Sequence, residues 1–166
     1  TDLSGVFTNC PNLINAACGA SITNLVNIYR NYPNLVKAAC GANVVNMHYA
    51  YANCPKLTIA NVGAKVEDMS FGFEGCINLT TAVCNANVTN MYMAYHNCTN
   101  LINAACGDKV TDLSNVYINC PNLVNAACGN GITNLANIYR NYPNLVKAAC
   151  GANVVDMSNA YRNCAK

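Results

Sequence analysis

The chain has 166 residues, the size of one ordinary domain. Hydrophobic residues make up 53% of it and charged residues only 10%, with a formal net charge of +2, so no surface for nucleic acid or for an anionic membrane is indicated. We find no initiator Met, no signal peptide and no apolar run near the ~18 residues of a membrane-spanning helix, and therefore expect a mature or excised fragment with no membrane insertion.

A repeat of 22 residues runs through the whole chain without a gap. We count repeat positions from the Val or Ile that opens each unit. The first unit lacks that residue. The sequence predicts a single array of seven to eight units: 1–21, 22–43, 44–65, 66–87, 88–109, 110–131, 132–153 and 154–166.

The first half of each unit has the apolar spacing of a helix. Position 4 is Leu or Met, position 8 is aromatic and position 11 is Cys or Tyr, so positions 4, 7, 8 and 11 follow the i, i+3, i+4, i+7 rule. Thr at position 2, such as Thr23, is a plausible N-cap, and Pro at position 12 with Asn at position 13 would end the helix. This pattern predicts a short helix in each unit.

The second half of each unit alternates as a strand does. Leu at position 14 is followed by Ala at 17, Cys at 19 and usually Gly at 20, which we expect to turn the chain at positive φ. One strand and one short helix per unit are typical of a leucine-rich repeat. We predict an α/β leucine-rich-repeat solenoid with a parallel sheet on one face and short helices on the other. The strands should centre near Ala16, Ala38, Ala60, Ala82, Ala104, Ala126 and Ala148.

Two stretches make the assignment to a leucine-rich repeat more specific. "VTNMYMAYHNCTNL" (88–101) and "VTDLSNVYINCPNL" (110–123) resemble the BspA-like leucine-rich repeats, which carry a "VTxMxxMFxxCxxL" half followed by a strand. The resemblance covers all 166 residues, although the strands have Ala and Cys where the family has Ile or Leu. It implies adhesin-like proteins that contact host or neighbouring surfaces.

Twelve cysteines alone would suggest a disulfide scaffold or a metal protein. Their positions favour two ladders of buried thiols, because both positions face inward and their substitutes, Tyr and Val, pack but cannot bridge. Some disulfides remain an alternative, and a metal site is a weaker one because metal-ligand spacings are absent. The cysteines lie at position 11 (Cys10, Cys54, Cys76, Cys98, Cys120, Cys164) and position 19 (Cys18, Cys40, Cys84, Cys106, Cys128, Cys150).

Other polar residues point to structure rather than to chemistry. His48 and His96 are predicted on the outer surface, and the seven carboxylates are scattered. No catalytic, nucleotide-binding or metal motif occurs, so we predict no enzyme activity, no cofactor and no metal. Asn at positions 3, 10 and 13 is expected to form hydrogen-bonded ladders along the solenoid and to satisfy turn backbone.

Positions 16 and 18 should point outward from the strands and form an exposed sheet face. This face is expected to be flat and made mainly of small residues, with few charges and no deep pocket. Such a surface favours a partner protein or a second copy of the chain over a small molecule. The predicted partner-binding residues are Lys37, Ile59, Asn61, Thr81, Val83, Asn103, Asn125 and Lys147.

A longer period is superimposed on the repeat. Residues 22–45 and 132–155 differ only at Val26 and Ala136, and Tyr replaces Cys at position 11 in both, as Tyr32 and Tyr142. We interpret this as a duplication of five units and expect the parent array to be longer. Because solenoid ends need caps and neither end shows one, each should lie against further chain or another molecule.

These features predict a non-enzymatic surface or extracellular leucine-rich-repeat protein that acts in adhesion or protein–protein binding. The alternative is a structural repeat of a fibre or filament, such as a phage appendage at a virion surface or an extracellular filament. Self-association end to end or through the sheet face would fit either function, and no nucleic-acid partner is expected.

Overall fold

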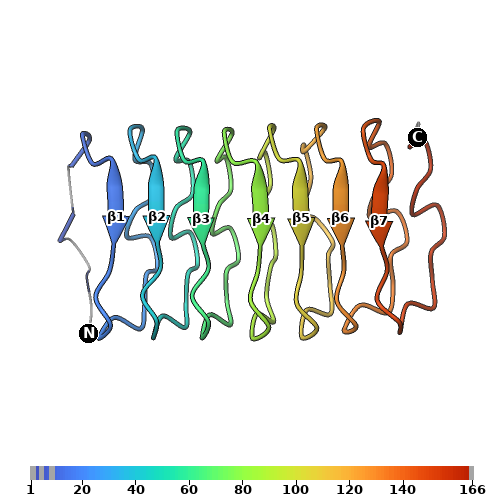
Figure 1. Cartoon of the computed structure of the whole chain (residues 1–166), viewed down its shortest axis with the longest axis horizontal. Coiled ribbons are helices and arrows are strands. Elements are labelled where there is room, and N and C mark those ends of the chain that lie inside the picture. Colours follow the sequence, from blue (N-terminus) through green and yellow to red (C-terminus); the bar gives the residue numbers. More distant parts are fainter. Residues whose placement is uncertain (1–2, 4–5, 8–9, 165–166) are drawn as a thin grey trace.

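The computed structural model describes residues 3, 6–7 and 10–164. Seven strands lie side by side in chain order along an elongated molecule, with β1 at one end and β7 at the other (Figure 1). Each strand has three residues and begins 22 residues after the one before it. The strands are β1 (Asn15–Ala17), β2 (Lys37–Ala39), β3 (Ile59–Asn61), β4 (Thr81–Val83), β5 (Asn103–Ala105), β6 (Asn125–Ala127) and β7 (Lys147–Ala149).

All strand pairs are parallel and in the same register. Ala16 pairs with Ala38 and Ala38 with Ala60, and the same alanine position pairs through β4–β7. Because every unit has the same length, each coil of chain brings the same position to the same place. The predicted strands and their centres are confirmed. Within the described chain the strands form two sheets, β1-β2-β3 and β4-β5-β6-β7, with no pairing between β3 and β4.

The predicted helices are wrong, because the described residues contain none. Repeat positions 4–11 instead form consecutive turns. The Ile28 amide donates to the Leu25 carbonyl (3.1 Å) and the Leu35 amide to that of Tyr32 (3.3 Å), an i to i−3 pattern. Positions 6 and 10 have positive φ, as in Asn27 (58°) and Asn31 (64°), which interrupts any helix and is typical of type II turns.

Asparagine explains why these turns form. Asn tolerates the left-handed region better than other residues with a side chain, and it occupies position 10 in every described unit except unit four, where Gly75 has φ 70°. The expected N-cap at Thr23 is also wrong. The next residue, Asn24, accepts a hydrogen bond from the Val26 amide through its side chain (2.9 Å), which forms an Asx turn.

The turns of neighbouring units are joined by a second ladder of backbone hydrogen bonds, opposite the sheet. Amides at positions 4, 6, 8 and 10 donate to carbonyls at positions 3, 5, 7 and 9 of the next unit. Between units two and three these are Leu25 to Asn46 (2.9 Å), Asn27 to His48 (3.1 Å), Tyr29 to Ala50 (2.9 Å) and Asn31 to Ala52 (2.8 Å). We call this side of the solenoid the turn face.

This turn-face ladder is incomplete at two successive junctions of the described chain and is fully interrupted at one of them. Four bonds join units three and four, four and five, and seven and eight, but only two join five and six, and none joins six and seven. The interruption coincides with Tyr142, which replaces Cys at position 11 and donates to the Tyr117 carbonyl (2.5 Å). A phenol is larger than a thiol, and the Tyr117–Tyr139 ring centroids are 6.5 Å apart against 5.6 Å for Tyr51–Phe73.

Glycine at position 20 serves close approach rather than a turn at positive φ. A Cβ on Gly41 would lie 2.9 Å from both the Cys18 Sγ and the Gly19 carbonyl oxygen, and a Cβ on Gly107 would lie 2.6 Å from the Asn85 carbonyl oxygen. Among the described glycines only Gly75 has positive φ. The expectation about φ is therefore wrong, and the physical reason is contact between successive coils.

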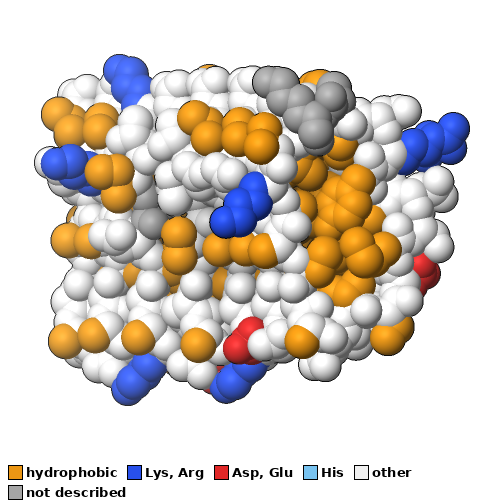
Figure 2. All heavy atoms as spheres, turned by 45° about the vertical axis from the view of Figure 1, so that its right-hand side comes forward, with side chains coloured by type: hydrophobic (Ala, Val, Ile, Leu, Met, Phe, Trp, Pro, Cys, Tyr) orange, Lys and Arg blue, Asp and Glu red, His pale blue; other side chains and the backbone are white. Residues whose placement is uncertain are grey.

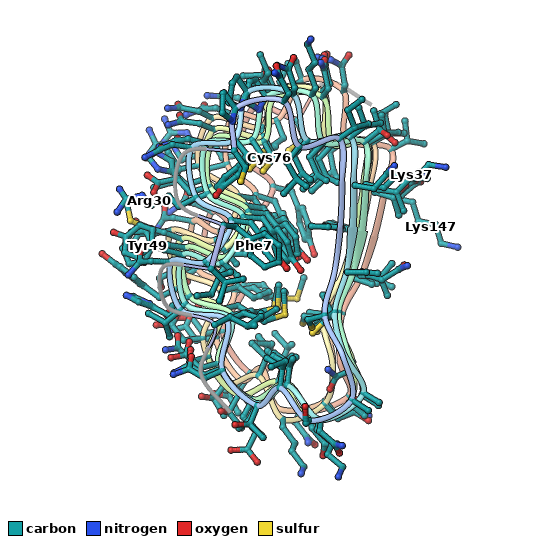
Figure 3. The ribbon with its side chains drawn as sticks, turned by 90° about the vertical axis from the view of Figure 1, so that its left-hand side faces the viewer. Phe7, Arg30, Lys37, Tyr49, Cys76 and Lys147 are labelled. Atoms are coloured by element: carbon teal, nitrogen blue, oxygen red, sulfur yellow. The ribbon has the colours of Figure 1, made fainter. Side chains whose placement is uncertain are left out.

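The core consists of side-chain ladders between the sheet and the turn face. Rings at position 8 stack along the axis, for example Tyr29 on Tyr51 (centroids 5.4 Å, interplanar angle 1°), and Phe7 lies inside the coil at one end of this ladder (Figure 3). The leucines of position 14 form the parallel ladder that was predicted. Leu35, Leu57, Leu79, Leu101, Leu123 and Leu145 are each at most 3% exposed, and Leu13 is half-buried.

Replacing one ladder leucine should destabilise the solenoid locally. Leu79 is fully buried, so we expect Leu79→Ala to lower the free energy of unfolding by about 2–5 kcal/mol. Because each unit contacts mainly its neighbours, hydrogen exchange should accelerate most in units three to five. Uniform acceleration over all units, or none, would contradict this arrangement.

Replacing Tyr142 by Cys should restore the missing turn-face bonds. The smaller side chain lets units six and seven approach as units three and four do, so the amides of Asn115, Tyr117 and Asn119 should exchange more slowly, by roughly tenfold. Unchanged exchange at these three amides would mean that another feature holds the units apart. The amide of Asn53, which already donates to Glu74 (2.6 Å), is the internal control.

Candidate protein-binding face

The eight residues predicted to bind a partner lie together on one face. They are the first and third residues of their strands, whereas central residues such as Ala38 (3% exposed) point into the core. Seven of the eight are exposed and Asn125 is half-buried. Lys37 and Lys147 project from the strand side, away from the core (Figure 3). We call this surface the sheet face.

The sheet face carries mostly small side chains and few charges. Its largest apolar side chains are Ile59 (52% exposed) and Val83 (54%), on the two strands that do not pair with each other. Between β5 and β6 the Asn125 Nδ2 donates to the Asn103 Oδ1 (2.7 Å), so even the surface amides are held in register. Small side chains allow another backbone or a flat protein surface to approach closely.

A groove of ≈ 670 Å³ runs beside the sheet face and was not predicted. It crosses five units, and its walls come from positions 13 and 15, just before each strand. The signal was present in the sequence, since position 15 is Val, Ile or Thr throughout, next to Asn at position 13. The lining residues are Thr58, Asn78, Thr80, Asn100, Ile102, Asn122, Val124, Asn144 and Val146.

The groove combines apolar and amide groups. Val146 is 61% exposed and Ile102 40% exposed. The position 13 amides are fixed by bonds between units, with Asn122 Nδ2 donating to the Thr99 carbonyl (2.9 Å) and Asn144 Nδ2 to the Pro121 carbonyl (3.1 Å). Figure 2 shows that hydrophobic side chains on this side lie in short rows among uncharged polar ones, with few charges.

The predicted asparagine ladders form as side-chain pairs at position 10; at position 13 only Asn100 and Asn78 pair (3.3 Å) while other amides donate to backbone carbonyls, and no ladder forms at position 3. At position 10, Asn53 Nδ2 donates to Asn31 Oδ1 (3.0 Å) and Asn119 Nδ2 to Asn97 Oδ1 (2.8 Å). At position 3, Asn and Asp accept from the amide two residues later in the same unit, because the Asx turn uses the side-chain oxygen locally. Together these bonds make the surface rigid.

The cysteines of position 11 from Cys54 onward each form the same hydrogen bond. The thiol donates to the position 8 carbonyl of the preceding unit, as from Cys76 to Tyr51 (3.1 Å) and from Cys98 to Phe73 (3.1 Å). Tyr32 donates to the corresponding carbonyl of Phe7. Position 11 therefore requires a buried side chain that donates a hydrogen bond and fills space in the core, and both Cys and Tyr meet this requirement. Cys76 lies inside the coil in Figure 3.

The cysteines of position 19 are mostly half-buried, and four of them, Cys18, Cys84, Cys106 and Cys128, accept from a glycine amide of the next unit, whereas Cys40 donates to the Gly41 carbonyl (3.6 Å). The Cys18 Sγ accepts from the Gly41 amide (2.9 Å) and the Cys84 Sγ from the Gly107 amide (2.8 Å). The eleven cysteines from Cys18 onward are thiols outside any disulfide. Burial raises the pKa of Cys54 to about 11 and that of Cys106 to about 12. The described residues contain no group of three or more His, Cys, Asp or Glu suited to a metal.

The two histidines each bridge adjacent units and are half-buried rather than fully outward. The His48 Nδ1 lies 2.7 Å from the Ser70 Oγ, and the His96 Nδ1 lies 3.3 Å from the Glu74 Oε1. The Ser70 hydroxyl in turn donates to the Asp68 Oδ1 (2.7 Å), so His48 belongs to a short polar chain between units three and four. No helix in the described chain is long and apolar enough to cross a membrane.

The architecture has a clear counterpart among solved structures. The crystal structure of the T. pallidum leucine-rich repeat protein TpLRR superposes with a TM-score of 0.74 over 86% of this chain and 70% of that one, at 17% identity. The fold is that of a leucine-rich-repeat solenoid. A leucine-rich repeat protein from Bacteroides ovatus aligns at a TM-score of 0.36 and 9% identity, over 93% of this chain and 65% of that one. The sequence matches no protein-family model and no curated protein.

The buried thiols should be almost inert in the folded protein. Since burial raises the pKa of Cys54, Cys98 and Cys106, little reactive thiolate exists at neutral pH. We expect a disulfide reagent to modify the exposed Cys150 fast and the buried thiols only on unfolding without reductant. Mass spectrometry of digested protein would identify each site. Rapid native labelling of Cys98, or few thiols after unfolding, would contradict the buried-thiol ladders.

Proposed function

We propose that this solenoid is a non-enzymatic protein-binding array of the BspA-like type, which binds a partner protein through its sheet face and the adjoining groove. The observation that carries the proposal is an exposed face to which all seven strands contribute, with one break in pairing between β3 and β4, next to a groove that crosses five units. Interfaces of this kind need a flat, rigid and partly apolar surface rather than a deep pocket.

The chemistry of the face supports protein binding over catalysis. Apolar groups such as Ile59, Val83 and Val146 supply area to bury, and fixed asparagine amides supply hydrogen bonds to a partner backbone. The charges are few, so shape and hydrogen bonding would decide selectivity. An extended segment of the partner could follow the groove and contact the same repeat positions in successive units.

We further propose that the protein works in adhesion at a cell surface or outside the cell. The support is the resemblance of residues 88–101 and 110–123 to BspA-like repeats, together with rigidity along the whole array. A fibre or filament unit is the second candidate. It is favoured by the near-identity of residues 22–45 and 132–155, because units of the same sequence present matching surfaces on which coils can stack end to end.

A charged side chain in the centre of the sheet face should disrupt partner binding. Val83 is exposed on β4, so Val83→Arg leaves the core intact while placing a bulky cation where the partner must approach. We expect at least about tenfold weaker binding to a protein captured from a panel of extracellular-matrix proteins. Surface plasmon resonance would measure it, and circular dichroism would confirm folding.

The matched control is Val155→Arg, which changes an apolar residue that is 87% exposed and lies outside the strands. Equal loss in both variants would show a non-specific effect of charge, and no loss in either would refute the sheet face as the binding surface. Light scattering and electron microscopy of the purified chain would test the second candidate. Filaments that form despite Val83→Arg would favour the fibre.

A further inference from the structure

The turn face of units three to five carries unusual residues at a position of fixed backbone conformation. Position 6 has positive φ in every unit where it is described. Four units use Asn there, namely Asn27, Asn115, Asn137 and Asn159. Units three, four and five use Tyr49 (φ 52°), Phe71 (54°) and Met93 (51°).

The positive φ of position 6 does not require these side chains. Aromatic residues and Met are disfavoured at positive φ, whereas Asn accepts it readily. Strained residues of this kind persist where the surrounding structure holds them and are concentrated at functional sites. Since Asn fits the same turn in four sister units, Tyr49, Phe71 and Met93 serve something other than the fold.

Two of these side chains, Tyr49 and Phe71, form what we call the turn-face cluster together with two residues of position 5, His48 and Tyr92. The Tyr49 and Phe71 rings stack at 4.4 Å with an interplanar angle of 16°. His48 lies edge-on to both rings, and Tyr92 is turned 75° from Phe71 at 5.4 Å. Tyr92 is 46% exposed, and the other three are half-buried.

The cluster lies in the acidic part of the turn face. Positions 2–10 of units three to five (45–53, 67–75 and 89–97) contain Glu67, Asp68 and Glu74 but no Lys or Arg. Asp68 accepts hydrogen bonds from the Ser70 amide (2.9 Å) and hydroxyl (2.7 Å), and Glu74 pairs with His96. Glu67 is exposed, with no side-chain partner in the described chain.

One guanidinium already binds this cluster within the chain. The Cζ of Arg30 lies 4.4 Å from the centroid of the Tyr49 ring, a cation–π contact. Both residues lie on the side of the coil opposite Lys37 and Lys147 (Figure 3). The duplicated segment offers a comparison, because Arg140 corresponds to Arg30 but unit eight presents Asn159 in place of Tyr49.

Tyr92, at the other end of the cluster, has no such cation over it within the described residues. Its ring is turned away from the stack and is the most exposed of the four. We propose that the turn-face cluster is a second binding site, for an arginine- or lysine-bearing segment of a partner protein. The partner cation contacts Tyr92 as Arg30 contacts Tyr49, and Glu67 and Glu74 supply the opposite charge.

The sister units supply variants that remove the cluster without disturbing the turns. Tyr49→Asn and Phe71→Asn introduce the residue of the four other units, and Tyr92→Ser introduces the residue at position 5 of units six and eight, Ser114 and Ser158. The triple variant should keep or raise Tm, since Asn suits positive φ better. Asp112→Asn is the control, because it removes a turn-face carboxylate outside the cluster and Asn forms the same Asx turn elsewhere.

The probe is an acetylated and amidated (Gly-Arg)4 peptide, with (Gly-Lys)4, (Gly-Glu)4 and a cello-oligosaccharide for comparison, titrated into the 15N-labelled chain. We expect the Arg peptide to shift the amides of Phe71, Tyr92 and Met93, and the Lys peptide to do so more weakly. The triple variant should bind the Arg peptide roughly tenfold more weakly, and Asp112→Asn should bind it like the parent. Added salt should weaken binding.

Three results would overturn the proposal. The first is an Arg peptide that shifts no residue of the cluster, or shifts only the sheet face. The second is equal affinity of the Arg peptide for the parent and for the folded triple variant. This result would mean that the peptide binds by general charge attraction and not through the aromatic cluster. The third is a response of the cluster to the oligosaccharide and not to the Arg peptide, which would identify a carbohydrate site. None of these results depends on the sheet face binding a partner.

Discussion

The structure depends on backbone hydrogen bonding between coils of equal length. Within the described chain each unit contributes only a three-residue strand and a series of turns, which cannot satisfy its polar groups alone. The sheet ladder and the turn-face ladder satisfy them by pairing each coil with its neighbours. Pairing requires the same residue count in every coil, and this is why the repeat of 22 residues is kept without a single insertion.

Close pairing in turn decides which side chains each position tolerates. Position 20 touches the preceding coil and is Gly from Gly41 to Gly151, except in unit four, where Asn85 donates to the Gly63 carbonyl through its side chain. Position 11 lies between coils and takes a thiol that donates to the carbonyl of the coil before it. Where Tyr142 makes the same bond with a larger side chain, the ladder between units six and seven is lost on the turn face but kept in the sheet. The spacing between coils therefore explains the cysteines better than redox chemistry does.

The sequence predicted the strands, their register and the Leu and aromatic ladders, because these follow from a period and an inward-facing pattern. The prediction of a short helix in each unit was wrong for a physical reason. Successive four-residue turns place positions 4, 7, 8 and 11 inward, which is also the pattern of one helical face. The distinguishing signal was the spacing of Asn27 and Asn31, since two residues suited to positive φ four apart interrupt a helix. Seven of the eight sheet-face residues are exposed as predicted and Asn125 is half-buried. The groove was not predicted, because it depends on how positions 13 and 15 pack across units, which a single unit does not reveal.

The core positions vary among similar apolar side chains, whereas the larger departures from the repeat lie on the two surfaces and are concentrated in the same units. On the sheet side, Ile59, Asn61 and Val83 depart from the usual Asn and Ala, and β3 and β4 do not pair. On the turn face, Tyr49 and Phe71 stack at the same junction, where all four ladder bonds remain. The strands of this junction are unpaired on the sheet side, whereas its turn-face ladder is complete. Departures from the repeat therefore coincide with a change in strand pairing as well as in surface chemistry, and both changes set this junction apart from the near-identical units of the duplicated block.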